Sequence, residues 1–299
     1  MTAVVPAIGT PVIARTRVEL AAALADLPGP RRFVPTMGAL HAGHAALLAA
    51  AGPGAILSIF VNPLQFGAHE DLDRYPRTFE NDYDIALAND VAVIYAPSVE
   101  EMYPDGVPQV TVHAGPLGAV YEGAARPGHF DGVLTVVARL FGQIRPDVAY
   151  FGQKDAQQLA LIRAMVRDLE LPVRVIEVPT VRESDGLALS SRNRYLEPDQ
   201  RRAALAISTA LATGTISGAE AVLAGEPRLR LDYCALVDPA TFGPVTGPLG
   251  RLIVAAYAGS TRLIDNDVID INADAVPEIA AFEVDLPAQT TAPASSKES

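Results

Sequence analysis

Cysteine and lysine are both scarce in this chain of 299 residues. Cys234 is the only cysteine, so no disulfide can form within one chain, and a metal site built from several cysteines is excluded. Of the 23 cationic residues, only Lys154 and Lys297 are lysines, and Lys297 lies in the C-terminal tail. The body of the chain therefore carries a single lysine. The low cysteine content favours a cytoplasmic location.

The chain also lacks a basic excess and a long apolar run. Its formal net charge of −12 argues against broad binding to nucleic acid or to an anionic membrane, because both need a basic surface. No apolar run approaches the length that spans a bilayer, and the N-terminus lacks the residue order of a secretory signal. We therefore expect neither nucleic acid nor membrane as a partner. The 49% of hydrophobic residues suffice for one large domain or two smaller ones.

Three common catalytic and binding motifs are absent from the sequence. There is no GxxxxGK[ST] phosphate loop and no GxGxxG after the first expected strand, which disfavours P-loop proteins and standard dinucleotide-binding proteins. GxSxG is absent too, so a hydrolase with a nucleophile elbow is unsupported.

What the chain does contain, up to about residue 180, is a regular alternation of short apolar runs with segments of helical spacing. Such a series predicts an α/β fold, with an open, doubly wound parallel sheet, right-handed crossovers and helices on both faces. Strands are expected at residues 33–35, 55–61, 91–95, 148–151 and 173–178, with an edge strand at 109–113, and helices at 18–27, 42–51, 79–89, 130–144 and 156–169.

A second, smaller portion follows in which helices and antiparallel strands mix, as in an α+β domain. It contains expected helices at 197–212 and 219–224, a strand at 229–237, and a hairpin formed by 252–256 and 262–265. We therefore divide the chain into domains 1–184 and 185–286. Residues 287–299 have the composition of a disordered tail.

Residues 31–51 predict a strand that leads through a glycine turn into a helix beginning near His41-Ala42-Gly43-His44. The two imidazoles, at positions i and i+3, lie on one side of the first helical turn, where unpaired N–H groups and the helix dipole favour an anion. Glycine at 38 and 43 allows a ligand to approach the backbone. The alternative is two partly exposed histidines on a helix. A zinc site is less favoured, because no third ligand lies nearby.

Other polar residues follow the ends of expected strands, where ligands gather in α/β sheets. Lys154 offers a compact positive charge that can follow a phosphate, and Asp155 can accept hydrogen bonds from ribose hydroxyls or cap the next helix. The loop 190–192 could close over a polyphosphate, or could be an ordinary turn. Neutral amides that suit hydroxyl and carboxylate groups stand at Asn62, Gln65 and Gln158. The isolated histidines, interpreted as surface or structural residues, are His69, His113 and His129.

Six blocks, in their order and spacing, resemble the pantothenate synthetase (pantoate–β-alanine ligase) family of the HIGH-type nucleotidyltransferases. They are PTMGALHAGH, SIFVNPLQF, DLDRYPRT, RPGHFDGVLTVV, FGQKDAQQL and VRESDGLALSSRNRYL, and the close match covers about residues 30–200. The resemblance implies a Rossmann-like N-terminal domain that binds ATP and pantoate. It also implies that the protein is a homodimer, with a smaller C-terminal domain that acts as a lid and is associated with the dimer. The activity is expected to depend on Mg²⁺ and ATP.

The reaction that the resemblance implies has two steps. The pantoate carboxylate attacks the α-phosphorus of ATP to give pantoyl adenylate and pyrophosphate. The amine of β-alanine then displaces AMP and forms the amide. Because both nucleophiles belong to substrates, the protein has to supply positioning and hydrogen-bond donors rather than a nucleophilic side chain.

The resemblance and the residue chemistry together assign the site residues. The catalytic donors are His41, His44, Lys154, Ser190, Ser191 and Arg192. The ATP contacts are Pro35, Met37, Gly43, His44, Gly152, Lys154, Asp155, Val181, Leu189, Ser190, Ser191 and Arg192. The pantoate and β-alanine contacts are Met37, Asn62, Gln65, Tyr75, Arg126 and Gln158. Asp82 is assigned as the magnesium contact.

Two positions depart from the family pattern. Gln153 stands where glutamate usually precedes the lysine, which removes a charge beside Lys154. Leu189 replaces the usual methionine with an apolar side chain of similar volume. Two other functions remain open: a related adenylyltransferase that makes no amide, and a nucleotide-binding protein without catalytic activity.

Overall fold

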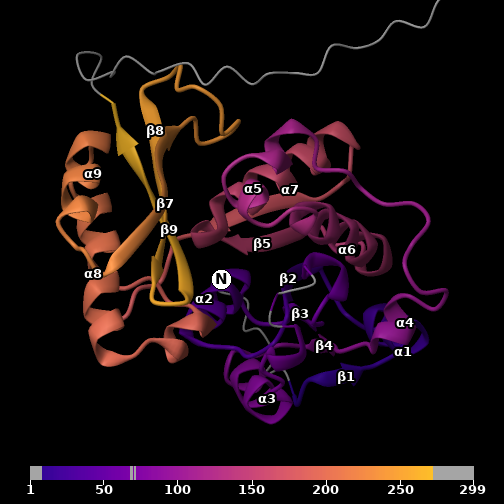
Figure 1. Ribbon diagram of the computed structural model, residues 1–299. Helices are drawn as coiled ribbons and strands as arrows, with labels where there is room; N and C mark the ends of the chain where they lie inside the picture. The colour runs from indigo at the N-terminus through magenta and orange to yellow at the C-terminus, as the bar shows by residue number, and fades with distance from the viewer. Residues whose placement is uncertain (1–8, 68–69, 71, 272–299) are drawn as a thin grey trace, which may run out of the picture.

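A computed structural model of the chain describes residues 9–67, 70 and 72–271 (Figure 1). In this part of the chain, a six-stranded parallel sheet is followed by a three-stranded antiparallel sheet. The strands of the first sheet are β1 (Val12–Ala14), β2 (Arg32–Thr36), β3 (Ile56–Ile59), β4 (Val93–Tyr95), β5 (Val148–Gly152) and β6 (Arg174–Val178). The predicted doubly wound α/β architecture is thus confirmed.

Strand order in the parallel sheet is β1-β4-β3-β2-β5-β6. The chain runs outward from β2 through β3 to β4, and then returns to place β5 on the other side of β2. The strand order therefore reverses between β2 and β5. Loops diverge at such a switch point and leave a crevice at the carboxyl ends of the strands.

Alternate residues of the strands point to opposite faces of the sheet and pack into two separate cores. Phe33 and Ile56 pack into one core, whereas their neighbours Val34 and Leu57 pack into the other. Helices α1 (Arg17–Ala25), α6 (His129–Ile144) and α7 (Ala156–Asp168) cover the first face, and α2 (Ala42–Ala51) and α3 (Phe79–Ala88) cover the second. The strands are apolar on both sides because both faces are covered.

The antiparallel sheet, in the order β7-β8-β9, lies beside the carboxyl end of β5 (Figure 1). Its strands are β7 (Leu229–Val237), β8 (Leu249–Ala258) and β9 (Thr261–Asp270). One face is covered by α8 (Pro198–Ala212) and α9 (Ile216–Ala224). From the other face, Val237 and Ile253 pack on Ala156 and Ala160 of α7. The second sheet is therefore anchored directly beside the turn that carries Lys154.

The expected strand at 109–113 is wrong. The N–H of Val112 donates to the hydroxyl of Thr135, and that of Ala114 donates to the carboxylate of Asp131. Side chains of α6 therefore satisfy this backbone in place of a neighbouring strand. Strand β1, one of the two edge strands of this sheet, was not expected.

The remaining elements are short. They are α4 (Val99–Met102), α5 (Glu122–Ala125) and the 3₁₀ turns η1 (Pro63–Gln65), η2 (Leu72–Arg74), η3 (Pro116–Ala119), η4 (Gln153–Asp155) and η5 (Ser191–Tyr195). The domain boundary at 184–185, between β6 and η5, stays a prediction, and the tail 287–299 lies outside the described residues. Among the helices of the described ranges, none is long and apolar enough to cross a membrane.

Candidate functional site

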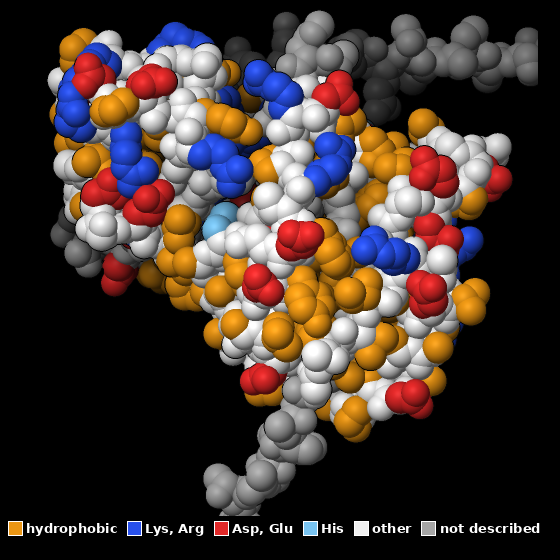
Figure 2. Space-filling model, turned by 90° about the horizontal axis from the view of Figure 1, so that it is seen from below, with side chains coloured by type: hydrophobic (Ala, Val, Ile, Leu, Met, Phe, Trp, Pro, Cys, Tyr) orange, Lys and Arg blue, Asp and Glu red, His pale blue; other side chains and the backbone are white. Residues whose placement is uncertain are grey.

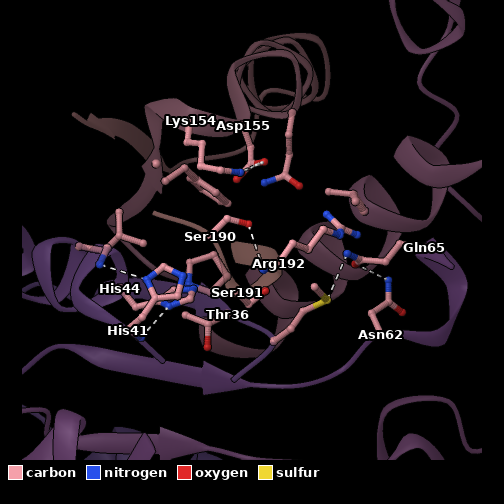
Figure 3. Close-up of a pocket in the computed structure, with 18 of the residues that line it drawn as sticks. Thr36, His41, His44, Asn62, Gln65, Lys154, Asp155, Ser190, Ser191 and Arg192 are labelled. Atoms are coloured by element: carbon pink, nitrogen blue, oxygen red, sulfur yellow. Dashed lines mark hydrogen bonds and ion pairs between the residues drawn. The ribbon is translucent and has the colours of Figure 1, made fainter. Parts of the chain in front are cut away.

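A cavity of about 280 Å³ opens at the carboxyl ends of the parallel strands, on both sides of the switch point (Figure 3). Its floor and walls come from residues that end β2 and β5 or follow β3 and β6, which are Thr36, Gly152, Asn62 and Thr180. The segment 189–192 closes one side. Strand ends, a helix start and a loop near the second sheet thus surround one volume.

The turn after β2 is shaped by Gly38, which has a φ of 82°. A Cβ atom there would stand 2.9 Å from a carboxylate oxygen of Asp82 and 3.0 Å from the side chain of Ile59, so no larger residue fits. The Asp82 carboxylate accepts the backbone N–H groups of Ala39 and Leu40, at 3.0 and 2.7 Å. This tight turn presents the start of α2 to the cavity.

The assignment of Asp82 to magnesium stays a prediction that these contacts do not favour. Its side chain is 1% exposed, it also accepts the Thr78 hydroxyl at 3.1 Å, and it does not line the cavity. A carboxylate offers about four acceptor positions, and three of those of Asp82 are taken by hydrogen bonds in a buried turn. Asp82 holds the turn and is poorly placed to bind a metal in the cavity.

His41 caps the N-terminus of α2, and His44 lies in its first turn. The Nδ1 atom of His41 accepts the N–H of Gly43 at 3.1 Å, and the Nδ1 atom of His44 accepts the N–H of His41 at 3.3 Å. A backbone N–H can only donate, so both Nδ1 atoms are unprotonated and the remaining proton of each ring is on Nε2. The ring centroids lie 4.2 Å apart. The pair therefore offers two Nε2–H donors.

The electrostatic surroundings keep both rings neutral. Burial, followed by repulsion from His41, lowers the pKa of His44 from 6.5 to about 3. Burial, followed by the positive charge of Lys154, lowers the pKa of His41. At neutral pH the histidines therefore act as hydrogen-bond donors without positive charge.

Lys154 lies in η4, directly after β5, and supplies the positive charge in this part of the cavity. Its ammonium is 3.5 Å from the carboxylate of Asp155. Burial opposes ionisation of that carboxyl group, but Lys154 and Arg192 outweigh it and hold the pKa of Asp155 below its usual value. Asp155 is thus an ionised acceptor beside a cation, with 49% of its side chain still exposed.

The backbone of this turn is fixed by the second sheet. The side-chain amide of Asn266, in β9, donates to the carbonyl oxygens of Gln153 and Lys154. Arg251, in β8, donates to the Asn266 oxygen at 2.6 Å and pairs with Glu177, in β6, at 2.9 Å. These contacts determine where the backbone of Lys154 lies.

The segment 189–192 brings two hydroxyl groups and a guanidinium to the cavity. The Ser190 hydroxyl accepts the N–H of Arg192 at 3.3 Å and caps η5. Among the described residues, none accepts a hydrogen bond from the Arg192 guanidinium. In the space-filling view, Lys and Arg side chains gather on the side of α8 and α9 and at its border with the larger sheet, where a histidine is visible (Figure 2). Asp and Glu side chains lie among them, but Arg126, Lys154 and Arg192 outnumber Asp155 among the described residues that line the cavity, so its lining is locally cationic despite the acidic overall charge.

The opposite wall of the cavity is neutral (Figure 3). The Asn62 amide donates to the Gln65 side-chain oxygen at 3.0 Å, and the Gln65 nitrogen lies 3.2 Å from the sulfur of Met37. Gln158 lines the cavity from α7, and apolar residues of α6 complete this wall. Arg126 stands at the edge and pairs with Glu70 at 2.5 Å.

The cavity brings together every assigned site residue except Asp82, although the roles given to them stay predictions. His129, interpreted as isolated, also lines it, and its Nδ1 lies 2.8 Å from the carbonyl of Gln65. Its position three residues after Arg126, an assigned site residue, could have indicated that His129 lies at the site. His113 is 80% exposed, and His69 lies outside the described residues. Lining residues that the sequence did not single out include Thr36, Phe60, Phe66, Thr180 and Tyr195.

The described residues do not fit a resident divalent cation. No group of three or more His, Cys, Asp or Glu side chains in the described part of the chain could hold a metal ion. Asp155 is the single carboxylate among the described residues that line the cavity, and it is paired with Lys154. A protein-bound Mg²⁺ would need more oxygen ligands than this wall provides.

Comparisons with known proteins agree with one another. The family described as pantoate-beta-alanine ligase matches residues 13–268. The pantothenate synthetase of Nocardioides sp. is 54% identical over 283 residues, covering 86% of this chain and 84% of that protein. The crystal structure of pantothenate synthetase from Thermus thermophilus superposes with a TM-score of 0.79 at 47% identity, covering 85% of this chain and 98% of that one.

A third relative was solved with ligands. The Francisella tularensis pantoate-beta-alanine ligase, whose structure is described as complexed with Beta-gamma ATP and Beta-alanine, superposes with a TM-score of 0.73 at 33% identity. The match covers 86% of this chain and 97% of that one.

Proposed function

The chain belongs to the pantoate-beta-alanine ligase family and condenses pantoate with β-alanine using ATP, and we propose that it does so through a pantoyl adenylate formed in the cavity between β2 and β5. The observation that carries this proposal is the convergence of neutral histidine donors, a lysine and an arginine on one cavity that also has a neutral wall. A polyphosphate suits the cationic side, and a small hydroxy acid suits the neutral side.

In the first step, the pantoate carboxylate attacks the α-phosphorus, and negative charge develops on the phosphoryl oxygens and on the departing pyrophosphate. His41 and His44 donate from Nε2 to these oxygens at the N-terminus of α2. Lys154 follows the charge as it moves toward the leaving group. Neutral histidines suit this role, because they donate hydrogen bonds without adding positive charges that would repel Lys154.

The segment 189–192 holds the triphosphate from the other side. Ser190 and Ser191 donate hydroxyl hydrogen bonds, and Arg192 supplies a guanidinium that donates no hydrogen bond to any described protein group. Asp155 accepts from the ribose hydroxyls. The rest of the nucleotide contacts the backbone or side chains of Pro35, Met37, Gly43, Gly152, Val181 and Leu189.

Pantoate occupies the neutral wall. Gln65 and Gln158 hold its oxygens, while Met37 and the apolar face of α6 pack against its dimethyl group. In the second step, the β-alanine amine enters beside Asn62, Tyr75 and Arg126 and attacks the acyl carbon. AMP leaves, and the amide forms. The β-alanine in the Francisella structure supports a site for this amine in the family.

Magnesium enters in this proposal as part of the MgATP substrate, held by the phosphates and water, since the described residues offer no group of protein ligands for it. We further propose that the chain acts in the cytoplasm as a homodimer, with residues 185–286 as the lid domain. The single cysteine and the family resemblance support these points.

The decisive experiment follows AMP, pyrophosphate and pantothenate with ATP, pantoate and β-alanine, and omits each substrate in turn. Stoichiometric formation of all three products is expected. Pyrophosphate without AMP and pantothenate would identify an adenylyltransferase that makes no amide. ATP binding without any turnover would identify a binding protein.

A further inference from the structure

Tyr103 lies immediately behind the neutral wall without lining the cavity. It follows α4, its side chain belongs to the core under α6, and it is 5% exposed. Its ring stands edge-on to Phe60 at 6.0 Å, and the guanidinium of Arg139 lies over it at 5.6 Å. These contacts hold the ring in one orientation, and this sets the direction in which its hydroxyl can donate a hydrogen bond.

That hydroxyl donates to the side-chain oxygen of Asn62 at 2.8 Å. The same oxygen accepts the N–H of Leu64 at 3.3 Å, and the Asn62 nitrogen donates to the carbonyl of Gly132 at 3.1 Å. Asn62 is 1% exposed. Its oxygen faces two donors and its nitrogen faces an acceptor, so one of the two amide orientations is strongly favoured.

The orientation of Asn62 sets that of Gln65. The second hydrogen of the Asn62 nitrogen is donated to the Gln65 oxygen at 3.0 Å. The Gln65 nitrogen is left facing Met37 and the cavity. Gln65 is therefore set as a donor and recognises an oxygen acceptor. If Asn62 were reversed, Gln65 would turn its oxygen to the cavity and repel a carboxylate.

We propose that Tyr103 is a positioning residue that, through Asn62, fixes Gln65 as a hydrogen-bond donor for the hydroxy-acid substrate. The proposal rests on the assignment of pantoate to the neutral wall. Burial, opposed in part by Arg139, raises the pKa of Tyr103 to about 12, so the hydroxyl keeps its proton throughout the working pH range.

The test is Tyr103→Phe, which removes the hydroxyl and keeps the ring. The kcat/KM for pantoate, measured at limiting pantoate, should fall about two- to tenfold, as expected for one lost hydrogen bond. The KM for ATP should stay within about twofold, because the cationic side is untouched. In the Gln65→Ala background, Tyr103→Phe should cause no further fall, since its effect passes through Gln65.

Tyr95→Phe is the matched control. Tyr95 is another buried tyrosine of the same core, 0% exposed, and its hydroxyl has no hydrogen-bond partner among the described residues. Its replacement should leave the kcat/KM for pantoate unchanged. A readout that needs no substrate is the side-chain amide NMR signal of Asn62, whose hydrogen exchange should quicken in Tyr103→Phe and not in Tyr95→Phe.

Three outcomes would overturn the proposal: equal pantoate kinetics for Tyr103→Phe and Tyr95→Phe, an equal loss for all three substrates, or a full effect of Tyr103→Phe that persists in Gln65→Ala. If the unaltered chain released no AMP, the proposed function would fail instead. The NMR comparison of the two phenylalanine variants would still decide the role of Tyr103.

Discussion

The side-chain amide of Asn266 donates a hydrogen bond of 2.8 Å to the backbone carbonyl of Lys154, and so ties the antiparallel sheet to the cation of the cavity. The same amide holds the carbonyl of Gln153 at 3.1 Å. The second sheet thus contributes to the site through the backbone of a turn that belongs to the first.

Asn266→Ala removes both of these donors and leaves Glu177 as the one remaining side-chain acceptor of Arg251 among the described residues. We expect a loss of about 1–3 kcal/mol in the free energy of unfolding and a fall in kcat of about tenfold, because the Lys154 turn is no longer held. Urea unfolding and steady-state kinetics measure the two effects. In Asn89→Ala, which removes a hydrogen bond of 2.8 Å to Ile85 away from the cavity, kcat should not change.

Lys154→Ala should slow adenylation by about a hundredfold or more, since it removes a charge that stabilises the departing pyrophosphate. Lys154→Arg should recover only part of this loss, because a planar guanidinium cannot follow the phosphate as an ammonium does. Single-turnover release of pyrophosphate is the measurement. The control is Arg167→Ala, which removes an exposed cation paired with Asp168. Near-normal adenylation in Lys154→Ala would show that the residue is wrongly assigned.

The lowered pKa of His44 predicts an acid sensitivity of the fold. Its pKa is about 3 in the folded protein against 6.5 for the free side chain, so below pH 6.5 the unfolded chain binds a proton that the folded chain does not. The contribution of neutral His44 to stability is therefore complete above pH 6.5. It is lost progressively, by about 1.4 kcal/mol per pH unit, as the pH falls toward 3.

This sensitivity is measured by comparing unfolding free energies of the parent protein and His44→Gln between pH 7 and pH 4. The parent should lose stability relative to the variant as the pH falls. His113→Gln, at a side chain that is 80% exposed, serves as the control and should follow the parent. A constant difference between the parent and His44→Gln across the range would contradict the prediction.

Asp82→Ala should destabilise the fold without altering the magnesium requirement. It leaves the buried N–H groups of Ala39 and Leu40 without an acceptor, at a cost of about 2–4 kcal/mol. Thermal unfolding reports the loss, and a magnesium titration of activity should give the same midpoint as the parent protein. Asp84→Ala, an exposed position on the same helix, should change neither quantity.

The sequence predicted most of the parallel sheet because its strands are continuous apolar runs and its helices have clear periodicity. Strand β1 was not predicted, because it is three residues long and its first two residues are exposed. Such a short segment shows no periodicity of apolar residues. The segment 109–113 resembled a strand, but its hydrogen bonds go to Thr135 and Asp131. Partners so distant in sequence cannot be found from local pattern alone.

Residues that line the cavity could be picked out where polar residues follow strand ends, as with His41, Lys154 and Asn62. The structure does not favour the magnesium assignment of Asp82, because an acidic residue that follows a matching block gives no sign of whether its oxygens are already occupied. Tyr103 could not be found at all, since it acts from within the core through an amide that only the folded arrangement brings near.

Lys154 and Lys297 are the only lysines of the whole chain, so the protein presents very few primary amines. Besides them, an acylating reagent would meet only the N-terminal amine, and the ammonium of Lys154 stands in the cavity, 19% exposed and beside Asp155. On the proposed role of Lys154 in binding ATP, covalent amine labelling followed by intact-mass analysis should show protection of one amine when nucleotide is added. The arginine side chains, which supply most of the positive charge, are not primary amines and do not react with the reagent.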